Sequence, residues 1–487
     1  MALIVTFVAF DPLEVKSTNT TEAALGAVKR EINNILSSYV GWFDPLCELI
    51  QNALDAVDAR SVLEGPESNY RPEIEVIIDL VGNALTVSDN GVGLDPEQFR
   101  QFLAPSLSFK NDGLSRGHKG VGATYIAYGF NYMRVSTRVP GFEASGRIRN
   151  ARKWVKSYGS SSNPKMEPDS DPGSSTAWEG WDRGVSVTVK FDDDTRPRQL
   201  DWLGAKDATT WSDVLRVKTG IGSVEANTTI LSTLRVLTVE GETEVSLEGT
   251  SYLWLHDQAS KVARFRDIEE VATTQLARYG PGRAMPGRFT QLDFIHETWT
   301  FEEIAELMDQ VLDEEDRSVL ASHTPSVRVE FGYTAKLWST FNENLNIRSG
   351  QRILVPGIQL AANNMPQGEV IQVPLLRNIG RQNQVHFLFH FDNYTPDLGR
   401  KGFHRELSEF AKTVSRYLTD RVLSKYKGLL RPNTGAAPDL AREIAIDTGS
   451  RRCSRTSKPN PCDLRVSTSF SRPSEYQSPR SRHANRT

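Results

Sequence analysis

The sequence is poor in cysteine. Its 487 residues contain three, Cys47, Cys453 and Cys462. Their spacing matches no usual zinc-ligand pattern, and an odd number of cysteines excludes a framework of fully paired disulfides. We therefore expect a reducing, cytoplasmic location.

Long apolar runs are also missing. The apolar stretch at residues 1–10 (MALIVTFVAF) is too short to span a bilayer. It lacks the basic start and the small-residue cleavage site of a signal peptide. We expect it to pack on the first domain as a strand or a strap, and we expect no membrane partner.

Neither sign of charge dominates the chain as a whole, because the net charge is −4. Such a balance gives no indication of binding to nucleic acid or to an anionic membrane. Residues 451–487 differ, with nine Lys or Arg against two Asp or Glu, a local net charge of +7. This composition predicts a disordered basic tail. A basic arm that binds nucleic acid and an altered reading frame are the alternatives.

Composition and periodicity divide the chain into three parts and predict an α+β fold. The first part, residues 1–198, has an insertion rich in Ser, Pro, Gly and Asp near 157–181. The second part, residues 199–430, mixes helices with strands and ends in an amphipathic helix over 402–430. Residues 431–487 form the tail.

Local patterns predict the individual elements. In the first part we expect helices over 22–60, with a break near Gly41, and over 95–102, and strands over 73–81, 84–88, 132–155 and 184–191. In the second part we expect helices over 210–219 and 300–313, and strands within 228–256 and over 326–338, 352–361, 369–376 and 384–391.

Polar side chains form a narrow stripe on the predicted helix over residues 45–60. Glu48, Asn52 and Asp55 are spaced i, i+4 and i+7, which puts them on one face, while most of the remaining surface is apolar. An amide oxygen is a suitable ligand for Mg²⁺, and a carboxylate can accept a proton from an attacking water. A half-buried helix whose polar stripe faces solvent would show the same pattern.

A second motif, Asp89-Asn90-Gly91-Val92-Gly93, follows a predicted strand. Glycine has no side chain and adopts unusual dihedrals, so a flat ligand can approach the backbone closely there. The carboxylate of Asp89 can accept a hydrogen bond from an exocyclic amino group such as that of adenine. An ordinary hairpin turn is the alternative, because Asn-Gly alone favours one.

A third motif, Gly117-His118-Lys119-Gly120-Val121-Gly122, precedes an apolar helical segment. Backbone N–H groups at the start of a helix bind phosphate well, and Lys110, Arg116 and Lys119 add positive charge. The sequence has no GxxxxGK[ST] run, so this is not a P-loop. A flexible surface loop is the alternative.

The three motifs, in this order, resemble those of the GHKL ATPase superfamily, which contains gyrase B, heat-shock-protein-90 chaperones, histidine kinases and MutL-type repair proteins. The resemblance covers residues 22–192. It implies that the first part is a Bergerat-type (GHKL) α/β sandwich, followed by a mixed α+β second domain. It also implies that the protein binds ATP with Mg²⁺ and hydrolyses the phosphoric anhydride bond.

The resemblance also implies roles for individual residues. Glu48 would be the general base and Asn52 the Mg²⁺ ligand, with Asp55 in a supporting role. Asp89 would bind the adenine amino group, and Gly93 would line the adenine pocket.

The phosphate side of the implied pocket comes from the third motif. Gly117, Gly120 and Gly122, with Lys119 and Val121 between them, would form a lid over the phosphates. Lys110 would contact phosphate as well.

One position departs from the pattern of the family. Many members have Gly-Thr at the start of a late strand, and this chain has Gly184-Val185. Ser186, Thr188 or a water would have to replace the threonine beside adenine.

Glu48 also distinguishes between branches of the superfamily, because histidine kinases resemble the pattern with Asn at that position. A carboxylate suits water activation, and the domain order is similar to the chaperone, gyrase and mismatch-repair branches. In those branches the second domain supplies a cation to the γ-phosphate. Lys401 is our candidate for it and Lys336 is the weaker rival. A basic residue near a helix start would explain Lys401 equally well.

We therefore expect a chaperone-like ATPase whose lid closure changes its contacts with a protein client or with a second copy in a homodimer. A nucleotide-gated binding module without significant hydrolysis is one alternative. A DNA-topology or repair factor that uses the basic tail is another. His386 and His390 share one face of a predicted strand, where packing is a simpler role than metal binding.

Overall fold

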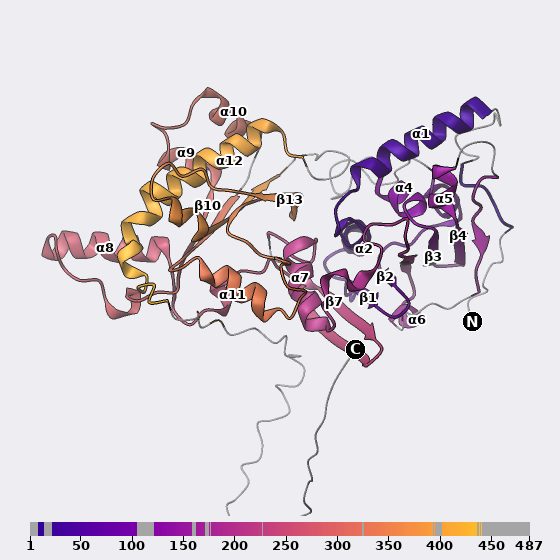
Figure 1. Ribbon diagram of the computed structural model, residues 1–487, viewed down its shortest axis with the longest axis horizontal. Helices are drawn as coiled ribbons and strands as arrows, with labels where there is room; N and C mark the ends of the chain where they lie inside the picture. The colour runs from indigo at the N-terminus through magenta and orange to yellow at the C-terminus, as the bar shows by residue number, and fades with distance from the viewer. Residues whose placement is uncertain are drawn as a thin grey trace, which may run out of the picture. The chain divides into compact units, whose positions relative to one another are not determined.

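The computed structural model describes residues 8–13, 22–104, 121–157, 162–170, 175, 177–225, 227–323, 326–392, 394, 402–435, 438 and 440. The fold is α+β, as predicted, with two mixed β-sheets and helices packed on them (Figure 1). Residues 1–445 form one compact unit. Within the described residues, no helix is both long enough and apolar enough to cross a membrane.

The described α-helices have the following bounds: α1 (Glu22–Ser38), α2 (Asp44–Glu64), α3 (Pro96–Gln101), α4 (Val121–Tyr128), α5 (Ala151–Lys156), α6 (Ala177–Gly180), α7 (Ala208–Lys218), α8 (Phe265–Tyr279), α9 (Phe301–Leu307), α10 (Glu314–Ser322), α11 (Lys336–Asn344) and α12 (Arg405–Tyr417). A π-helical turn (Leu418–Val422) and a 3-10 helix (Leu423–Leu429) continue α12.

The described strands have the following bounds: β1 (Glu73–Asp79), β2 (Ala84–Asp89), β3 (Tyr132–Val139), β4 (Phe142–Arg149), β5 (Glu167–Pro168), β6 (Gly184–Lys190), β7 (Asn227–Thr238), β8 (Gly241–Thr250), β9 (Val262–Arg264), β10 (Phe294–Thr300), β11 (Ser326–Gly332), β12 (Gly357–Ala362), β13 (Met365–Ile371) and β14 (Val385–Phe391).

The first sheet has eight described strands in the order β5-β4-β3-β6-β2-β1-β7-β8. Val76, Val87, Val187 and Val135 are register partners across four neighbouring strands, so their side chains lie on the same face. This face belongs to one apolar core with side chains of α1, α2 and α4. Figure 1 shows these helices beside the sheet.

Helix α2 is held by its apolar positions and begins near the predicted residue. Leu46, Leu49, Ile50 and Leu54 are buried in the core under the sheet. The pair Asp44-Pro45 is a helix start signal that predicts Asp44 as the cap. This prediction is wrong, because the N-cap is Phe43, which makes no side-chain cap. Instead, Asp44 Oδ2 accepts a hydrogen bond of 2.7 Å from Gly41 N and fixes the turn before the helix.

Helix α3 forms where its start signal predicts. Asp95 is the N-cap and accepts a hydrogen bond from Gln98 N, while the Gln98 side chain accepts one from Asp95 N. This reciprocal pair is a capping box, which satisfies two backbone donors at the start of a helix.

The first sheet continues beyond residue 198, where we expected the first domain to end. Strand β7 pairs in parallel with β1, from Glu73 opposite Leu231 to Asp79 opposite Leu237, and β8 then pairs with β7. The pattern of the sequence cannot reveal this boundary, because the two paired strands are far apart along the chain.

The second sheet has six described strands in the order β13-β12-β14-β11-β10-β9. Its strand β14, VHFLFHF, is buried along its whole length because both faces of the sheet are covered. Phe387 and Phe389 face a core that includes α8, α9 and α12. Leu388 faces the opposite way and belongs to the core of the first sheet.

Several predicted elements differ from the structure. Strand β4 ends before Asn150, whose φ of 56° turns the chain into α5, so the expected strand over 132–155 is wrong at its end. The predicted strand over 326–338 is β11 followed by the start of α11, and the predicted helix over 300–313 is α9 and ends at Leu307. Helix α8 was not predicted.

The described part of the N-terminal stretch packs as a strap. Phe10 forms an isolated antiparallel bridge with Met166, through hydrogen bonds of 3.3 and 3.0 Å. Its ring also meets Phe99 of α3 edge to face, with centroids 6.3 Å apart. These contacts tie residues 8–13 to the first sheet and to α3.

Candidate functional site

Helix α2 carries Glu48 into the interior of the first part, where 1% of the residue is exposed. Tyr39 Oη donates a hydrogen bond of 3.4 Å to Glu48 Oε1. Glu48 Oε2 lies against Gly122, so closely that a methyl group on Gly122 would overlap it. The carboxylate is therefore held at the first turn of α4, next to helix N–H groups that favour negative charge.

The polar stripe continues along α2 toward the Asp-Asn-Gly loop. Asn52 is partly buried one turn beyond Glu48, and Asp55 is buried beyond it. Gly91 then packs on Ala56, where a Cβ on the glycine would lie 2.5 Å from the carbonyl carbon. At 1.5 Å per residue, Glu48 and Ala56 are about 12 Å apart along the helix. One helix thus joins the third motif to the second.

Asp89 is the last residue of β2 and is 5% exposed. Its register partners, Ile74 and Val185, place it on the helix-covered face of the sheet. Burial raises the pKa of the Asp89 carboxyl to about 7, although hydrogen bonds from Gly91 N and Val185 N oppose the increase. The bond from Gly91 N to Asp89 Oδ1 is 2.9 Å long.

Two glycines let the backbone approach Asp89 and its loop. Gly93 has a φ of 72°, and a Cβ there would lie 2.5 Å from Arg138 O on β3. Gly184 has a φ of 141°, and a Cβ there would overlap Asp89 O. A larger residue at either position would push the strands or the loop apart.

Asn90 anchors the loop from the other side. Its Oδ1 accepts hydrogen bonds from Tyr70 Oη (3.0 Å) and Glu73 N (2.9 Å), and its Nδ2 donates to Arg71 O (2.7 Å). The residue next to Asp89 therefore has a structural role that links β2 to the segment before β1.

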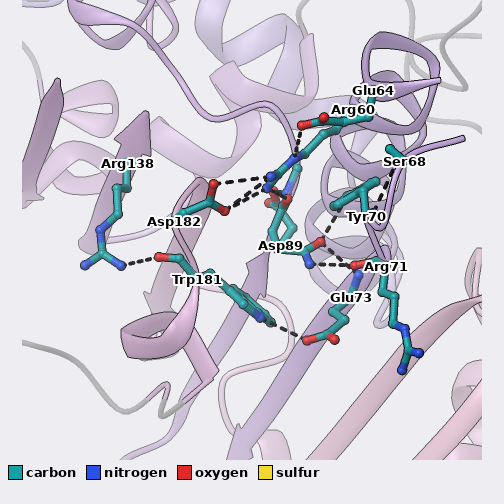
Figure 2. Close-up of polar contacts among 12 residues, drawn as sticks. Arg60, Glu64, Ser68, Tyr70, Arg71, Glu73, Asp89, Arg138, Trp181 and Asp182 are labelled. Atoms are coloured by element: carbon teal, nitrogen blue, oxygen red, sulfur yellow. Dashed lines mark hydrogen bonds and ion pairs between the residues drawn. The ribbon is translucent and has the colours of Figure 1, made fainter. Parts of the chain in front are cut away.

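Arg60, at the far end of α2, completes this support (Figure 2). It donates to Asn90 O at 2.8 Å, to Asp182 Oδ1 at 3.2 Å and to Glu64 Oε1 at 3.2 Å. Its guanidinium also stacks over the ring of Tyr70, 4.5 Å from the centroid. The residue after Asp89 is thus held by both its side chain and its backbone carbonyl group.

Thr188 is not brought together with these residues. It alternates with Val185 and Val187 along β6 and lies on the opposite face, where its Oγ1 is 2.8 Å from Thr86 Oγ1. Ser186 faces the same way and pairs with Ser88 at 2.7 Å. The residue beside Asp89 is Val185, in place of the threonine that the GHKL resemblance implies. The backbone N–H of Val185 donates a hydrogen bond to the Asp89 carboxylate.

Part of the predicted site lies outside the described residues. This applies to Lys110, Arg116, Gly117, Lys119, Gly120 and Lys401. Val121 and Gly122 are described as the first residues of α4, with Val121 in the apolar core and Gly122 against Glu48. The rival cation Lys336 is exposed, and its Nζ donates to Gly435 O at 3.3 Å.

Sequence reasoning missed three residues that support the site. Tyr39 contacts Glu48, Arg60 holds the Asn90 loop, and Lys218 lies at the flank of α2, where Cys47 Sγ donates to Lys218 O at 3.1 Å. Burial lowers the pKa of Lys218 to about 8. No sequence motif identifies these residues, because each contacts its partner only in the folded chain.

The oxygen donors of this site suit a hydrated cation that binds together with a phosphate ligand. Within the described residues, no three His, Cys, Asp or Glu side chains form a group that could hold a metal ion alone. Mg²⁺ that is bound to phosphates needs only one or two protein oxygens. Glu48 and Asn52 offer such oxygens at one end of the site, and Asp89 offers a buried acceptor at the other.

Comparison with protein-family models and with curated proteins gives no match for this chain.

Proposed function

We propose that the protein binds ATP with Mg²⁺ at the site formed by Glu48, Asn52, Asp89 and Gly93, and that it hydrolyses the nucleotide. The observation that carries the proposal is the course of α2. The first part of this helix holds Glu48 against the first turn of α4, and Ala56, eight residues further along, packs on the Asp-Asn-Gly loop. A nucleotide along α2 would have its phosphates near α4 and its base near Asp89.

Each residue has a chemical task in this proposal. Asp89 accepts a hydrogen bond from the adenine amino group, and Gly93 leaves room for the ring. Asn52 supplies an oxygen to Mg²⁺, which neutralises phosphate charge when bound. Glu48 accepts a proton from the attacking water, and the hydrogen bond from Tyr39 orients its carboxylate.

We further propose that this protein is a member of the GHKL superfamily and of its chaperone-like branch. The segment over 105–122 closes as a lid, and Lys401 approaches the γ-phosphate from the second domain. Closure then changes contacts with a protein client or with a second copy in a homodimer. We place this activity in the cytoplasm, where Mg²⁺ and ATP are abundant.

The role of Glu48 is tested by measuring phosphate release from ATP in the presence of Mg²⁺, with wild type and variant compared at equal nucleotide occupancy. We expect Glu48→Ala to lower turnover by roughly 10²–10⁴-fold and to retain nucleotide binding, because a general base contributes to the chemical step. Glu97→Gln is the matched control, because Glu97 is exposed on α3, where it accepts a hydrogen bond from Gln101. This control should hydrolyse ATP at the wild-type rate.

Wild-type turnover by Glu48→Ala would exclude Glu48 as the base. Tight ATP binding without turnover in the wild type would favour the nucleotide-gated binding module instead. No nucleotide binding by the wild type would refute the proposal as a whole.

A further inference from the structure

The second sheet has a polar row that the proposed ATPase does not use. His296, Glu330 and His386 are register partners on β10, β11 and β14, so their side chains share one face. Thr298 and Arg328 form the next row on the same face, with Leu388. The opposite face of these strands is an apolar core.

Most of this row is satisfied by hydrogen bonds. His386 Nδ1 is 2.8 Å from Val355 O and therefore donates to it, which leaves Nε2 to accept from Tyr252 Oη at 3.0 Å. Glu330 Oε2 accepts from the backbone N–H groups of Leu255 and His256 and from His256 Nδ1, at 3.0–3.1 Å. These contacts fix the chain after β8 against the sheet.

Beside this row lies a cavity of about 240 Å³. Its lining includes Ser223, Ser251, Trp254, His256, His296 and Arg328. The rings of His256 and His296 stack, with centroids 4.2 Å apart and planes within 12°. The volume is below that of usual pockets for drug-sized ligands, so the cavity suits a small ligand.

Arg328 is a half-buried cation in the wall of this cavity. Among the described residues its Nε is buried without a hydrogen-bond partner. Burial lowers the pKa of Arg328, and Glu225 opposes this effect from an exposed position. A guanidinium stays protonated in proteins, so its partial burial costs free energy that a bound anion would offset.

Two carboxylates also line the cavity, and each lies close to a basic side chain. Glu297 is bonded to Arg264 and Arg266, at 3.5 and 3.3 Å. Asp257 lies 3.6 Å from His256 Nε2. Arg216 donates to Ser251 O at 3.1 Å and to Ser251 Oγ at 3.2 Å. Arg328 differs from these arginines because its buried Nε has no hydrogen-bond partner, and a bound anion would supply one. Glu330 Oε1, in the neighbouring row, is also buried without a partner.

Neutral donors lie around Arg328. Burial, with a smaller contribution from His256, lowers the pKa of His296 to about 4, so the ring is neutral near pH 7 and offers one N–H. The hydroxyl of Thr298 is opposite Arg328 on the neighbouring strand. A neutral imidazole and a hydroxyl can bind an oxyanion without adding repulsion.

We propose that this cavity, the Arg328 pocket, binds a small oxyanion, with the Arg328 guanidinium as its charged partner and His296 and Thr298 as neutral donors. The ligand class is a phosphate or a small carboxylate. The pocket is separate from the Glu48 site, and the inference does not depend on ATP binding.

Thermal unfolding of the full chain in inorganic phosphate, malonate or chloride at equal ionic strength tests this pocket. We expect phosphate or malonate to raise the Tm of the wild type above its value in chloride, because a ligand that binds the folded state stabilises it. Arg328→Gln should lose this specific increase, with oxyanion binding weakened by at least about tenfold. It should fold in chloride, because the buried Nε of Arg328 has no hydrogen-bond partner to lose.

Arg317→Gln is the matched control, since Arg317 is a half-exposed arginine paired with Asp309 at 3.1 Å. It should keep the oxyanion-dependent increase in Tm. Phosphate also stabilises proteins without binding, by exclusion from their surfaces. An equal increase in wild type and in Arg328→Gln would show only this general effect and would overturn the proposal.

A measurement on the wild type avoids dependence on a folded variant. A bound anion favours the imidazolium form, so phosphate should raise the pKa of His296 above its value of about 4. Titration of the His296 ring by NMR, with and without phosphate, reports this change. An unchanged pKa at phosphate concentrations that saturate the Tm response would contradict the assignment to this pocket.

Discussion

At the scale of single residues, Asp89 has the most unusual environment of the candidate site. It is almost fully buried, and burial raises the pKa of its carboxyl to about 7. The backbone N–H groups of Gly91 and Val185 hold it in place. Because ionising this buried carboxyl costs free energy, an additional hydrogen bond from the amino group of a ligand would stabilise its charge. This fits the proposed contact with adenine.

The raised pKa of Asp89 predicts a pH-dependent stability. Between the ordinary value of 3.8 and about 7, the folded state binds a proton that the unfolded state releases. The contribution of Asp89 to stability is therefore fully present below pH 4 and is lost as pH rises to 7. Asp89→Asn should remove this contribution, which changes by about 1.4 kcal/mol per pH unit.

Urea unfolding of both proteins between pH 4 and 7 measures the effect. The difference in unfolding free energy, wild type minus Asp89→Asn, should fall steadily across this range. A difference that stays constant with pH would show that Asp89 titrates at its ordinary value. The same variant should bind ATP more weakly, and unchanged affinity would remove Asp89 from the adenine site.

Gly93 should tolerate no side chain. Gly93→Ala has to adopt a φ of 72° and also to displace Arg138 O, which would be 2.5 Å from the new Cβ. Gly141→Ala is the matched control, because Gly141 has a φ of 82° but nothing within 4 Å of the added Cβ. The control should lose about 1 kcal/mol of stability from backbone strain alone.

The difference in lost unfolding free energy between the two variants measures the cost of the close contact between the loop and β3. We expect Gly93→Ala to lose at least about 2 kcal/mol, measured by denaturant unfolding. Equal losses in the two variants would mean that the loop moves away freely, and would weaken the case for a rigid wall at this point.

Residues of this site differ in how far the sequence predicts them. Glu48, Asn52 and Asp89 could be selected because helical spacing and a strand end place them predictably. Thr188 was wrongly assigned, because it is three residues beyond Val185 on β6 and alternation along a strand puts it on the opposite face. Tyr39 gave no signal, since it reaches Glu48 only after α1 and α2 pack together.

At the scale of elements, the loop after β2 depends on Asn90. Its side chain makes three hydrogen bonds and the residue is 7% exposed. Asn90→Ala leaves Glu73 N and Arg71 O without their partner, so we expect a loss of about 2–3 kcal/mol in chemical unfolding. Asn90→Asp keeps both bonds to Oδ1 and loses the one to Arg71 O, so its loss should be smaller.

Loss of Asn90 should also weaken nucleotide binding, because the loop presents Asp89. An Asn90→Ala variant within about 0.5 kcal/mol of the wild type would show that water replaces these bonds without cost. Stability and ATP affinity measured on the same samples separate a structural effect from a direct one.

Elements with strong local signals were predictable from the sequence. Helix α3 begins where Asp95 and Pro96 indicate, because capping and proline geometry act within a few residues. Helix α8 was missed because few of its residues are apolar and it buries only Phe265 and Ile268. The end of β4 was misplaced because Asn150 turns the chain without any glycine or proline.

At the scale of the whole molecule, the first sheet joins segments that the sequence analysis assigned to different domains. Its apolar core includes Leu234 of β7 and Trp338 of α11 together with residues of α2. The proposed ATP site and the start of the second part therefore share one core. The proposed conformational ATPase would need such a shared core to connect its site to the second part of the chain.

This continuity predicts that a chain ending at residue 198 cannot fold stably. Without β7, strand β1 becomes an edge with unpaired backbone groups, and its buried side chains lose their cover. We expect residues 1–198 to aggregate or to unfold without a cooperative transition, whereas residues 1–445 should unfold in a single transition. Size-exclusion chromatography and thermal unfolding followed by circular dichroism measure both properties.

A chain ending at residue 255 separates the two causes of this instability. It restores β7 and β8 beside β1 but lacks Leu337, Trp338 and Phe341 of α11, which belong to the same core. Its Tm should therefore lie below that of residues 1–445, even if it remains monomeric, because apolar surface stays exposed. A soluble 1–198 fragment with the Tm of residues 1–445 would mean that the first part is independent. The second sheet would then have no mechanical connection to the nucleotide through this core.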